Sequence, residues 1–262
     1  STSGIHRIKV RPSGAGYEVD DLDKILWQAA ATDVAFGYDG GVYFTDWVSG
    51  WNAPGKGRIY RIFDPGRRND PRVLAMKDLM AAGFEAQESG ALRAMLGHPD
   101  MRVRMEAQFE LASRGLDSLG EFNRVLRSQG DLLPRLHAVW GIGQTLDRAG
   151  VGQDQYELWQ QVEPLVAALE RSDAEVRAQI CKVLGELRVD AAFSILEEAL
   201  NDESARVRYF AAVSLGKLGH VEAVPALLRM AAANNDKDVY LCHAVVMALV
   251  GINDLPSILA AA

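Results

Sequence analysis

The chain lacks the residue patterns that usually mark a catalytic or metal site. Its two cysteines, Cys181 and Cys242, fall in separate helical segments and form no CxxC, CxxCH or zinc spacing. None of its five histidines stands in an HExxH or HxH pattern, and His137 lies inside a helical segment, where packing is expected. Residues 14–16 are too short for a dinucleotide loop, residues 55–57 lack the Ser or Thr that ends a Walker loop, and no serine stands in a GxSxG elbow. We therefore predict no catalytic residue, no metal ligand and no cofactor in this chain.

The chain also lacks an excess of basic residues and any long apolar run. Its formal net charge of −7 argues against nucleic-acid binding, and the adjacent pair Arg67-Arg68 stands in a turn-like stretch where solvation is expected. No run of eighteen apolar residues predicts a membrane span, and the first ten residues lack the apolar core of a secretory signal. Because the chain begins without methionine, we expect either a processed product or a piece of a longer polypeptide.

The first part of the sequence reads as short strands. The segments IHRIKV, VAFG, GVYFTDW and GRIYRIF alternate apolar and polar residues, and glycine, aspartate or proline bounds each one. Residues 38–41 (YDGG) predict a tight turn, and Val42, Phe44 and Asp46 should share one face of the next strand. Four such strands amount to about one blade of a β-propeller, which would be marginal alone because its edges and one apolar face stay uncovered.

After the turn-rich segment 63–71 the apolar period becomes helical and repeats. We predict two domains, residues 1–66 with the strands and residues 67–262 with the helical repeats. The fold class is mainly α, an α-α superhelix with a small N-terminal antiparallel β segment. Each repeat is a helix–turn–helix unit whose apolar faces are buried only when neighbours stack. Five copies align at the anchor positions Arg104, Arg135, Arg177, Arg208 and Tyr240, followed three residues later by Ala107, Ala138, Ile180, Ala211 and His243, and then by Leu111, Ile142, Leu184, Leu215 and Met247.

Aspartates recur four residues before most anchors. They are expected to cap the second helix of each repeat, and the first three are also placed to pair with the arginine of the same helix. A recurring Asp/Arg set can be mistaken for an active site, but its period favours a structural ladder. The ladder consists of Asp100, Arg104, Asp131, Arg135, Asp173, Arg177 and Arg208, with Asp236 as the aspartate of the fifth copy.

One cluster in the β segment remains open between two interpretations. Tryptophan and arginine together can hold sugar-like or anionic ligands, and acidic loop residues can hold a cation. The alternative is structural: turn chemistry at the aspartates, and a seal at the domain junction with arginine stems over aromatic rings. The cluster consists of Asp39, Asp46, Trp47, Trp51, Lys56, Arg58 and Arg61.

The helical part resembles HEAT repeats, in particular the short HEAT-like, PBS-lyase type. The D-x-x-V-R…A…LG pattern carries this resemblance over about residues 88–251 and recurs five times. The fifth copy departs from it, with Tyr240 in place of arginine and His243 in place of alanine. The resemblance implies an α-solenoid with an extended surface for a protein partner.

The N-terminal part resembles the last portion of a glucose/sorbosone dehydrogenase-like propeller, through GAGYE (14–18), DVAFG (33–37) and GKGRIYR (55–61). A propeller end followed by HEAT-like repeats is similar to the bacterial PVC-type haem-binding CxxCH proteins, also described as membrane-bound dehydrogenases. That resemblance implies an extracytoplasmic protein of which this chain is an internal fragment. It places any haem c or quinone cofactor in other parts of the longer protein.

Two functions follow from these patterns. The first is a protein–protein interaction scaffold that is not catalytic by itself, does not bind nucleic acid and does not span a membrane. The alternative is a fragment of an extracytoplasmic sugar or alcohol oxidoreductase. The sequence leaves the substrate, the partner, the binding face and the oligomeric state open.

Overall fold

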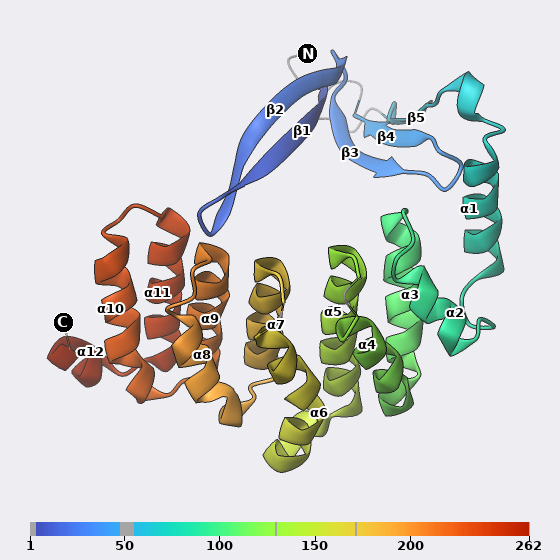
Figure 1. Ribbon diagram of the computed structural model, residues 1–262. Helices are drawn as coiled ribbons and strands as arrows, with labels where there is room; N and C mark the ends of the chain where they lie inside the picture. The colour runs from blue at the N-terminus through green and yellow to red at the C-terminus, as the bar shows by residue number, and fades with distance from the viewer. Residues whose placement is uncertain (1–3, 48–54, 129, 171, 262) are drawn as a thin grey trace. The chain divides into compact units, whose positions relative to one another are not determined.

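A computed structural model describes residues 4–47, 55–128, 130–170 and 172–261 (Figure 1). It divides into two compact units, Ser1–Pro12 with Tyr17–Ala86 and Ser13–Gly16 with Gln87–Ala262. The predicted boundary after residue 66 stays a prediction. Within the described ranges, no helix is both long and apolar enough to cross a membrane.

The first unit holds two antiparallel sheets and a helix. Strands β1 (Gly4–Ser13) and β2 (Gly16–Trp27) form a two-stranded ribbon, and β3 (Ala31–Phe36), β4 (Val42–Asp46) and β5 (Arg58–Ile62) form a three-stranded sheet in that order. The small antiparallel β segment is thus confirmed, but the strands are not arranged as four neighbours in one sheet. Strand β2 carries DDLDK in its middle, and this charged run breaks the alternation by which strands are recognised.

The register of the three-stranded sheet confirms the predicted faces of β4. Phe44 pairs with Tyr60 and Val42 with Ile62, so these side chains share one face. Phe44 is 5% exposed, and its ring stacks on that of Tyr60 with centroids 5.1 Å apart. The predicted turn before β4 is also present, with Gly40 at a φ of 75° that favours glycine.

Helix α1 (Pro71–Ala82) completes the first unit after a 3₁₀ turn at Pro65–Arg67. The carboxylate of Asp70 caps α1 by accepting from the Arg72 N–H, and Pro71 stands at the first helical position, where no N–H is needed. The charges Arg67 and Arg72 surround Asp70, so the turn-like stretch of the sequence serves as a helix start.

The second unit is a solenoid of helix pairs, as Figure 1 shows. The second helices of successive repeats pack side by side: α3 (Met101–Ser113), α5 (Leu132–Ala149), α7 (Ala174–Glu186), α9 (Ala205–Leu218) and α11 (Val239–Ile252). The first helices are α2 (Ser89–Met95), α4 (Leu119–Leu126), α6 (Gln155–Leu169), α8 (Phe193–Ala199) and α10 (Val224–Asn234), and α12 (Leu255–Ala261) follows the last pair. The predicted fold class, a mainly α superhelix with a small N-terminal β segment, is confirmed.

The repeated apolar positions form the core of the solenoid. Leu111, Ile142, Leu184 and Leu215 are each at most 1% exposed, as the alignment predicts. A glycine follows each of the last two leucines, and at Gly216 close packing between helices explains why it is a glycine. A Cβ on Gly216 would lie 2.5 Å from Ala248 Cα, so α9 and α11 approach too closely for any side chain there.

In the fifth copy, the buried positions lie one residue later than the alignment predicts. His243 is exposed and Met247 is 47% exposed, whereas Ala244 and Ala248 are fully buried. The start of α11 also differs from the prediction, because Asp238 rather than Asp236 caps the helix by accepting from the N–H groups of Tyr240 and Leu241. The helix therefore begins two residues later than the aligned aspartate predicts.

Candidate functional site

The anchor arginines hold the turn that joins the two helices of a repeat. Arg104 Nη1 donates to the carbonyls of His98 (2.7 Å) and Pro99 (3.0 Å). Arg208 Nη1 donates in the same way to the carbonyls of Asp202 (2.7 Å) and Glu203 (3.1 Å). These contacts satisfy carbonyl groups that a helix–helix turn leaves free, so the repeated arginine stabilises the turn.

The anchor arginines Arg135 and Arg177 pair with aspartates of the following repeat and not with the aspartate at the start of their own helix. Arg135 Nη1 lies 2.8 Å from Asp173 Oδ2, and Nε and Nη2 of Arg177 each donate to the Asp202 carboxylate at 2.9 Å. The predicted pairs within the first three copies are therefore wrong: Asp100 with Arg104, Asp131 with Arg135, and Asp173 with Arg177. The arginine side chain reaches the turn of the following repeat, which helical spacing alone does not show.

Only part of the predicted capping pattern has the expected hydrogen bonds. Asp100 caps α3 by accepting from the Arg102 N–H at 2.9 Å, and it also pairs with the Arg102 guanidinium at 2.7 Å. This pairing is the main reason that the pKa of Asp100 lies below its usual value, because it outweighs the effect of partial burial. Asp131 and Asp173 occupy the cap positions of α5 and α7 without a side-chain cap hydrogen bond.

The structure divides the predicted cluster of the β segment between the two ends of β4. At one end, Asp39 accepts from the Gly41 N–H (3.0 Å) and the Tyr43 hydroxyl (2.9 Å), and Arg61 lies 2.7 Å away. The Gly41 hydrogen bond, then that of Tyr43, lowers the pKa of Asp39. Arg61 also lies over the ring of Phe63, 4.5 Å from its centroid, which is the arrangement of the structural interpretation.

At the other end, Asp46 pairs in register with Arg58 and accepts from the Ala30 N–H at 3.0 Å. Trp47 is 46% exposed, Lys56 is exposed, and Trp51 lies outside the described residues. The described members of the predicted cluster thus lie at the two ends of one small sheet. Their role as a ligand site stays a prediction.

A polar chain runs through the buried interior between α3 and α5. Arg104 Nε donates to His137 Nε2 (3.3 Å), which leaves Nδ1–H of the ring to donate to Gln108 Oε1 (2.8 Å). His137 is 4% exposed, and burial followed by the charge of Arg104 lowers its pKa to about 4. The imidazole is therefore neutral at pH 7, and it packs as the sequence predicts.

The cysteines and acidic residues give no reactive or metal-binding cluster in the part of the chain that the structure describes. Burial raises the pKa of the Cys181 thiol to about 12, which keeps it in the unreactive protonated form. Cys242 is half-buried, and its Sγ lies 3.1 Å from Asn234 Nδ2. Within those same residues, no group of three or more His, Cys, Asp or Glu side chains is placed to hold a metal ion.

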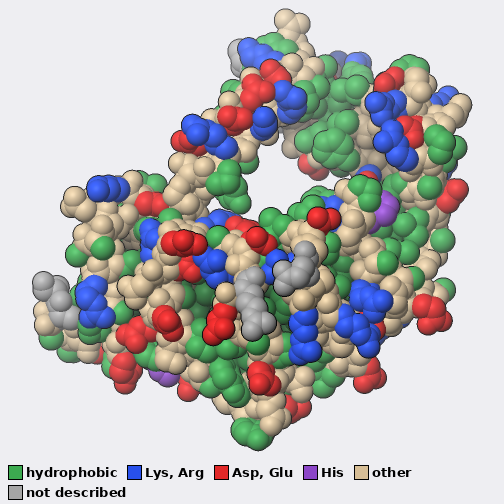
Figure 2. Space-filling model, in the orientation of Figure 1, with side chains coloured by type: hydrophobic (Ala, Val, Ile, Leu, Met, Phe, Trp, Pro, Cys, Tyr) green, Lys and Arg blue, Asp and Glu red, His purple; other side chains and the backbone are tan. Residues whose placement is uncertain are grey.

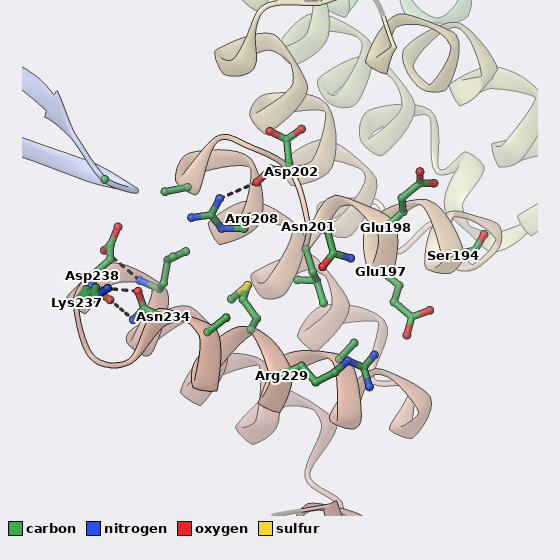
Figure 3. Close-up of a pocket in the computed structure, with 17 residues that line it drawn as sticks. Ser194, Glu197, Glu198, Asn201, Asp202, Arg208, Arg229, Asn234, Lys237 and Asp238 are labelled. Atoms are coloured by element: carbon green, nitrogen blue, oxygen red, sulfur yellow. Dashed lines mark hydrogen bonds between the residues drawn. The ribbon is translucent and has the colours of Figure 1, made fainter.

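The strongest candidate site is a hollow among α8, α9, α10 and α11, called here the α8–α11 hollow (Figure 3). Its floor is apolar, because Leu200, Ala226, Met230 and Leu241 are all at most 7% exposed. Its polar wall consists of Ser194, Glu197, Glu198, Asn201, Asp202, Arg208, Arg229, Asn234, Lys237 and Asp238.

Some charged side chains of this hollow have a partner of opposite charge within the protein, and others have none. Asp202 forms an ion pair with Arg177. Partial burial acts to raise the pKa of Asp202, but the hydrogen bonds from Arg177 and from the Ser204 N–H outweigh it, so the pKa lies below its usual value. Among the described residues, by contrast, no ion pair involves Glu197 or Glu198 on α8, or Arg229 and Lys237 on the other side. Arg208 and Asp238 form no ion pair among these residues either, but both bond to backbone groups. The hollow therefore offers two acids and two bases whose side chains have no described partner, above an apolar floor.

Sequence reasoning did not find these residues. Glu197 and Glu198 lie on α8, and Arg229 lies on α10. The sequence predicts both helices from their apolar residues alone, so it gives no sign that these charged residues share a site. The polar run NNDKD (234–238) between two apolar helices was the available signal, but such a run is usually a solvated turn. In Figure 2, acidic and basic side chains are interspersed over the solenoid face in view, so charge alone does not single out the hollow.

Comparison with known proteins supports the helical assignment for the second half of the chain. Residues 162–252 match the family model of HEAT repeats, which covers α7 to α11 and most of α6. The HEAT-like resemblance is confirmed for these residues. The resemblances to a dehydrogenase propeller and to the haem-binding family stay predictions.

Two curated relatives match about a third of the chain. One is the bilin biosynthesis protein PecE of Nostoc sp., 38% identical over 99 residues that cover 35% of this chain and 38% of that protein. The other is the phycocyanobilin lyase subunit alpha of Microchaete diplosiphon, 39% identical over 95 residues that cover 33% and 32%. The matched stretch thus spans about a third of the length of each relative. A crystal structure of an engineered protein is 19% identical over 63% of this chain and 78% of its own, but its TM-score of 0.41 is too low to establish a shared fold.

Proposed function

We propose that this chain is a protein-interaction scaffold and that the α8–α11 hollow takes a peptide segment of its partner. The observation that carries the proposal is the unpaired charge on its walls. Glu197, Glu198, Arg229 and Lys237 surround an apolar floor without a described partner of opposite charge. A segment with apolar side chains and charges of both signs would pair with them. HEAT-like arrays present such extended surfaces to partners.

The experiment is capture of a partner from the source cells, followed by binding measurements with the purified partner. The test variant is the double substitution R229E/K237E, which reverses the basic wall. The matched control is R124E, because Arg124 is exposed on α4 and does not line the hollow.

We expect the double variant to weaken partner binding at least about tenfold, which corresponds to about 1.4 kcal/mol, while the control binds like the wild type. Equal affinity of the double variant and the wild type would remove the hollow from the interface. A partner that R124E also loses would place the interface elsewhere on the solenoid.

A second candidate function rests on the two relatives, whose names describe bilin biosynthesis and a phycocyanobilin lyase subunit. Under it, the solenoid would hold a bilin, an open-chain tetrapyrrole with apolar rings and two carboxylates. Arg229 and Lys237 above the apolar floor supply the matching charges. Added phycocyanobilin should then change its visible absorbance with the wild-type chain and not with R229E/K237E. An unchanged spectrum with wild-type chain at high micromolar concentration would reject this candidate.

The oxidoreductase alternative, with its extracytoplasmic location and a haem c or quinone cofactor elsewhere in a longer protein, stays a prediction from the sequence. Dye-linked dehydrogenase assays on the natural full-length polypeptide would test it. Inactivity across sugars and alcohols, with cofactor added, would count against it.

A further inference from the structure

A short turn of the chain lies at one end of the α8–α11 hollow. Residues 13–16 (SGAG) belong to the same compact unit as the solenoid helices, and Gly14 is one of the residues that line the hollow. Ala15 is 2% exposed and Gly16 is buried, so this turn is held against the solenoid. We propose that residues 13–16 are an internal ligand of the hollow, and that a glycine-flanked turn of the protein partner displaces them.

The backbone of Ala15 is bound on both sides by side chains of the solenoid. Its N–H donates to Asp238 Oδ2 at 2.7 Å, and its carbonyl accepts from Arg206 Nη1 at 3.3 Å. A buried backbone group needs such a partner, and these two come from α9 and from the residue that caps α11. Recognition of this turn is thus directed at its backbone.

Close contact explains the two glycines of this turn. A Cβ on Gly14 would lie 2.2 Å from Asp238 Oδ2, and one on Gly16 would lie 2.2 Å from Tyr240 Cε2. Close-packed proteins leave no room for atoms at such distances. Gly14 also has a φ of 57°, which favours glycine, as in two-residue hairpin turns. The site that admits only such a turn, called here the turn recess, consists of Arg206, Asp238 and Tyr240.

The turn recess also accounts for the departure of the fifth repeat from the pattern. Tyr240 stands where the four earlier repeats have arginine, and its ring lies against Gly16. Asp238 has two roles, because Oδ1 accepts from the N–H groups of Tyr240 and Leu241 while Oδ2 accepts from the Ala15 N–H. The two residues by which the start of α11 departs from the repeat are thus the two that contact the turn.

The chain's own turn competes with a partner for this end of the hollow. A segment that fills the hollow reaches Asp238, which lines it, and meets Gly14 there (Figure 3). Because the turn is part of the same chain, its effective concentration at the recess is high, and a weak partner is kept out. This inference rests on the proposed function, since the displacing turn belongs to the partner of the scaffold.

Fluorescence anisotropy with a peptide added in trans tests the turn recess. The probe is a fluorescein-labelled peptide of residues 11–18 (RPSGAGYE), and the receiver is the full chain with Gly14→Val/Gly16→Val, whose own turn no longer fits. We expect saturable binding to this double variant and at least about tenfold weaker binding to the wild type, whose turn occupies the recess. The same peptide with valine at both glycine positions should not bind.

Asp238→Asn and Asp236→Asn are matched variants that leave the turn itself unchanged. Asparagine has one side-chain oxygen, and the two N–H groups that it caps at the start of α11 retain it. Asp238→Asn should therefore release the turn, so that the Ala15 amide exchanges with deuterium at least about tenfold faster than in the wild type. Asp236→Asn should leave that rate unchanged, and far-UV circular dichroism confirms that each variant is folded.

Two results would overturn the proposal. One is peptide binding that is absent from the double variant, or equal in the double variant and the wild type. The other is fast exchange of the Ala15 amide in the wild type, because the turn would then not be docked.

The variant R229E/K237E separates this inference from the proposed function, since neither residue donates to the turn among the described residues. If the peptide behaves as expected while R229E/K237E binds the partner like the wild type, the turn recess stands and the walls of the hollow leave the interface.

Discussion

Helices α9 and α11 are neighbours in the solenoid, yet they bury different positions of the same repeat. In α9, Arg208 holds the preceding turn and Leu215 is fully buried. In α11, Tyr240 stands at the place of the arginine and is 44% exposed, and Met247 at the place of the leucine is 47% exposed. Ala248 is buried instead and lies against Gly216. The comparison teaches that aligned positions of a repeat need not be buried alike, because the packing between neighbouring helices decides which side chains reach the core.

The largest expected effect contrasts the two positions that the repeat pattern aligns. Leu215→Ala should lower the free energy of unfolding by about 2–5 kcal/mol, because it leaves a cavity in a closed core. Met247→Ala should change it by less than about 0.5 kcal/mol, because half of that side chain already faces solvent. Urea unfolding followed by far-UV circular dichroism measures both. Similar losses for the two variants would mean that α11 keeps the register of α9.

The next effect concerns the close approach of the two helices. Gly216→Ala places a Cβ 2.5 Å from Ala248 Cα, so we expect a loss of about 1–3 kcal/mol from overpacking. Gly120→Ala on α4 is the control, because a Cβ there meets no atom within 4 Å. It should be neutral or slightly stabilising, since alanine favours helix more than glycine does. A harmless Gly216→Ala variant would show that α9 and α11 are further apart than described.

The third prediction compares His137, which is buried in the solenoid, with His243, which is exposed on α11. The folded-state pKa of His137 is about 4, below the ordinary 6.5, so the unfolded chain takes up a proton first as the pH falls. The stabilising contribution of neutral His137 is complete above pH 6.5 and is lost as the pH falls toward 4. At pH 5 the free energy of unfolding should be about 2 kcal/mol lower than above pH 6.5.

His137→Asn should remove that part of the pH dependence, whatever its effect on stability at pH 7. His243→Gln is the control variant, because His243 is exposed on α11 and takes no part in the buried polar chain of Arg104, His137 and Gln108. Urea unfolding at pH 7.5 and pH 5.0 gives the comparison. If His137→Asn lost as much stability between these pH values as the wild type, the buried imidazole would not be the cause.

The smallest effect tests the helix start directly. Asp238→Ala should cost about 1 kcal/mol through the lost cap of α11. Asp236→Gly should cost little, because no backbone N–H of that helix bonds to Asp236 and glycine accepts the φ of 57° at this position. Thermal unfolding of the two variants under identical conditions measures the difference. A larger loss for Asp236→Gly would restore the start of α11 that the repeat spacing predicts.

These contrasts show where sequence reasoning succeeds. The period of the apolar residues predicts four of the five second helices with their buried Leu111, Ile142, Leu184 and Leu215, because that pattern is local to each helix. The turn at Gly40 is equally local, since its positive φ favours glycine. The fifth copy fails because Asp236 and Asp238 are both good capping residues, and only packing against α9 decides between them.

The candidate sites could not be predicted in the same way. Arg135 meets Asp173 and Arg177 meets Asp202 across repeats, and those distances depend on how the helices stack. The walls of the α8–α11 hollow come from separate helices, and each charge by itself is typical of a solvated helix face. Strand β2 was missed for a related reason, because its charged middle has no apolar alternation to reveal it.

Hydrogen–deuterium exchange of the chain with and without its captured partner tests the scaffold proposal most directly. The account predicts slower exchange on binding in the segments that form the α8–α11 hollow, residues 194–208 and 226–241, and little change in α3 and α5. Protection confined to other helices, with exchange in the hollow unchanged, would contradict it.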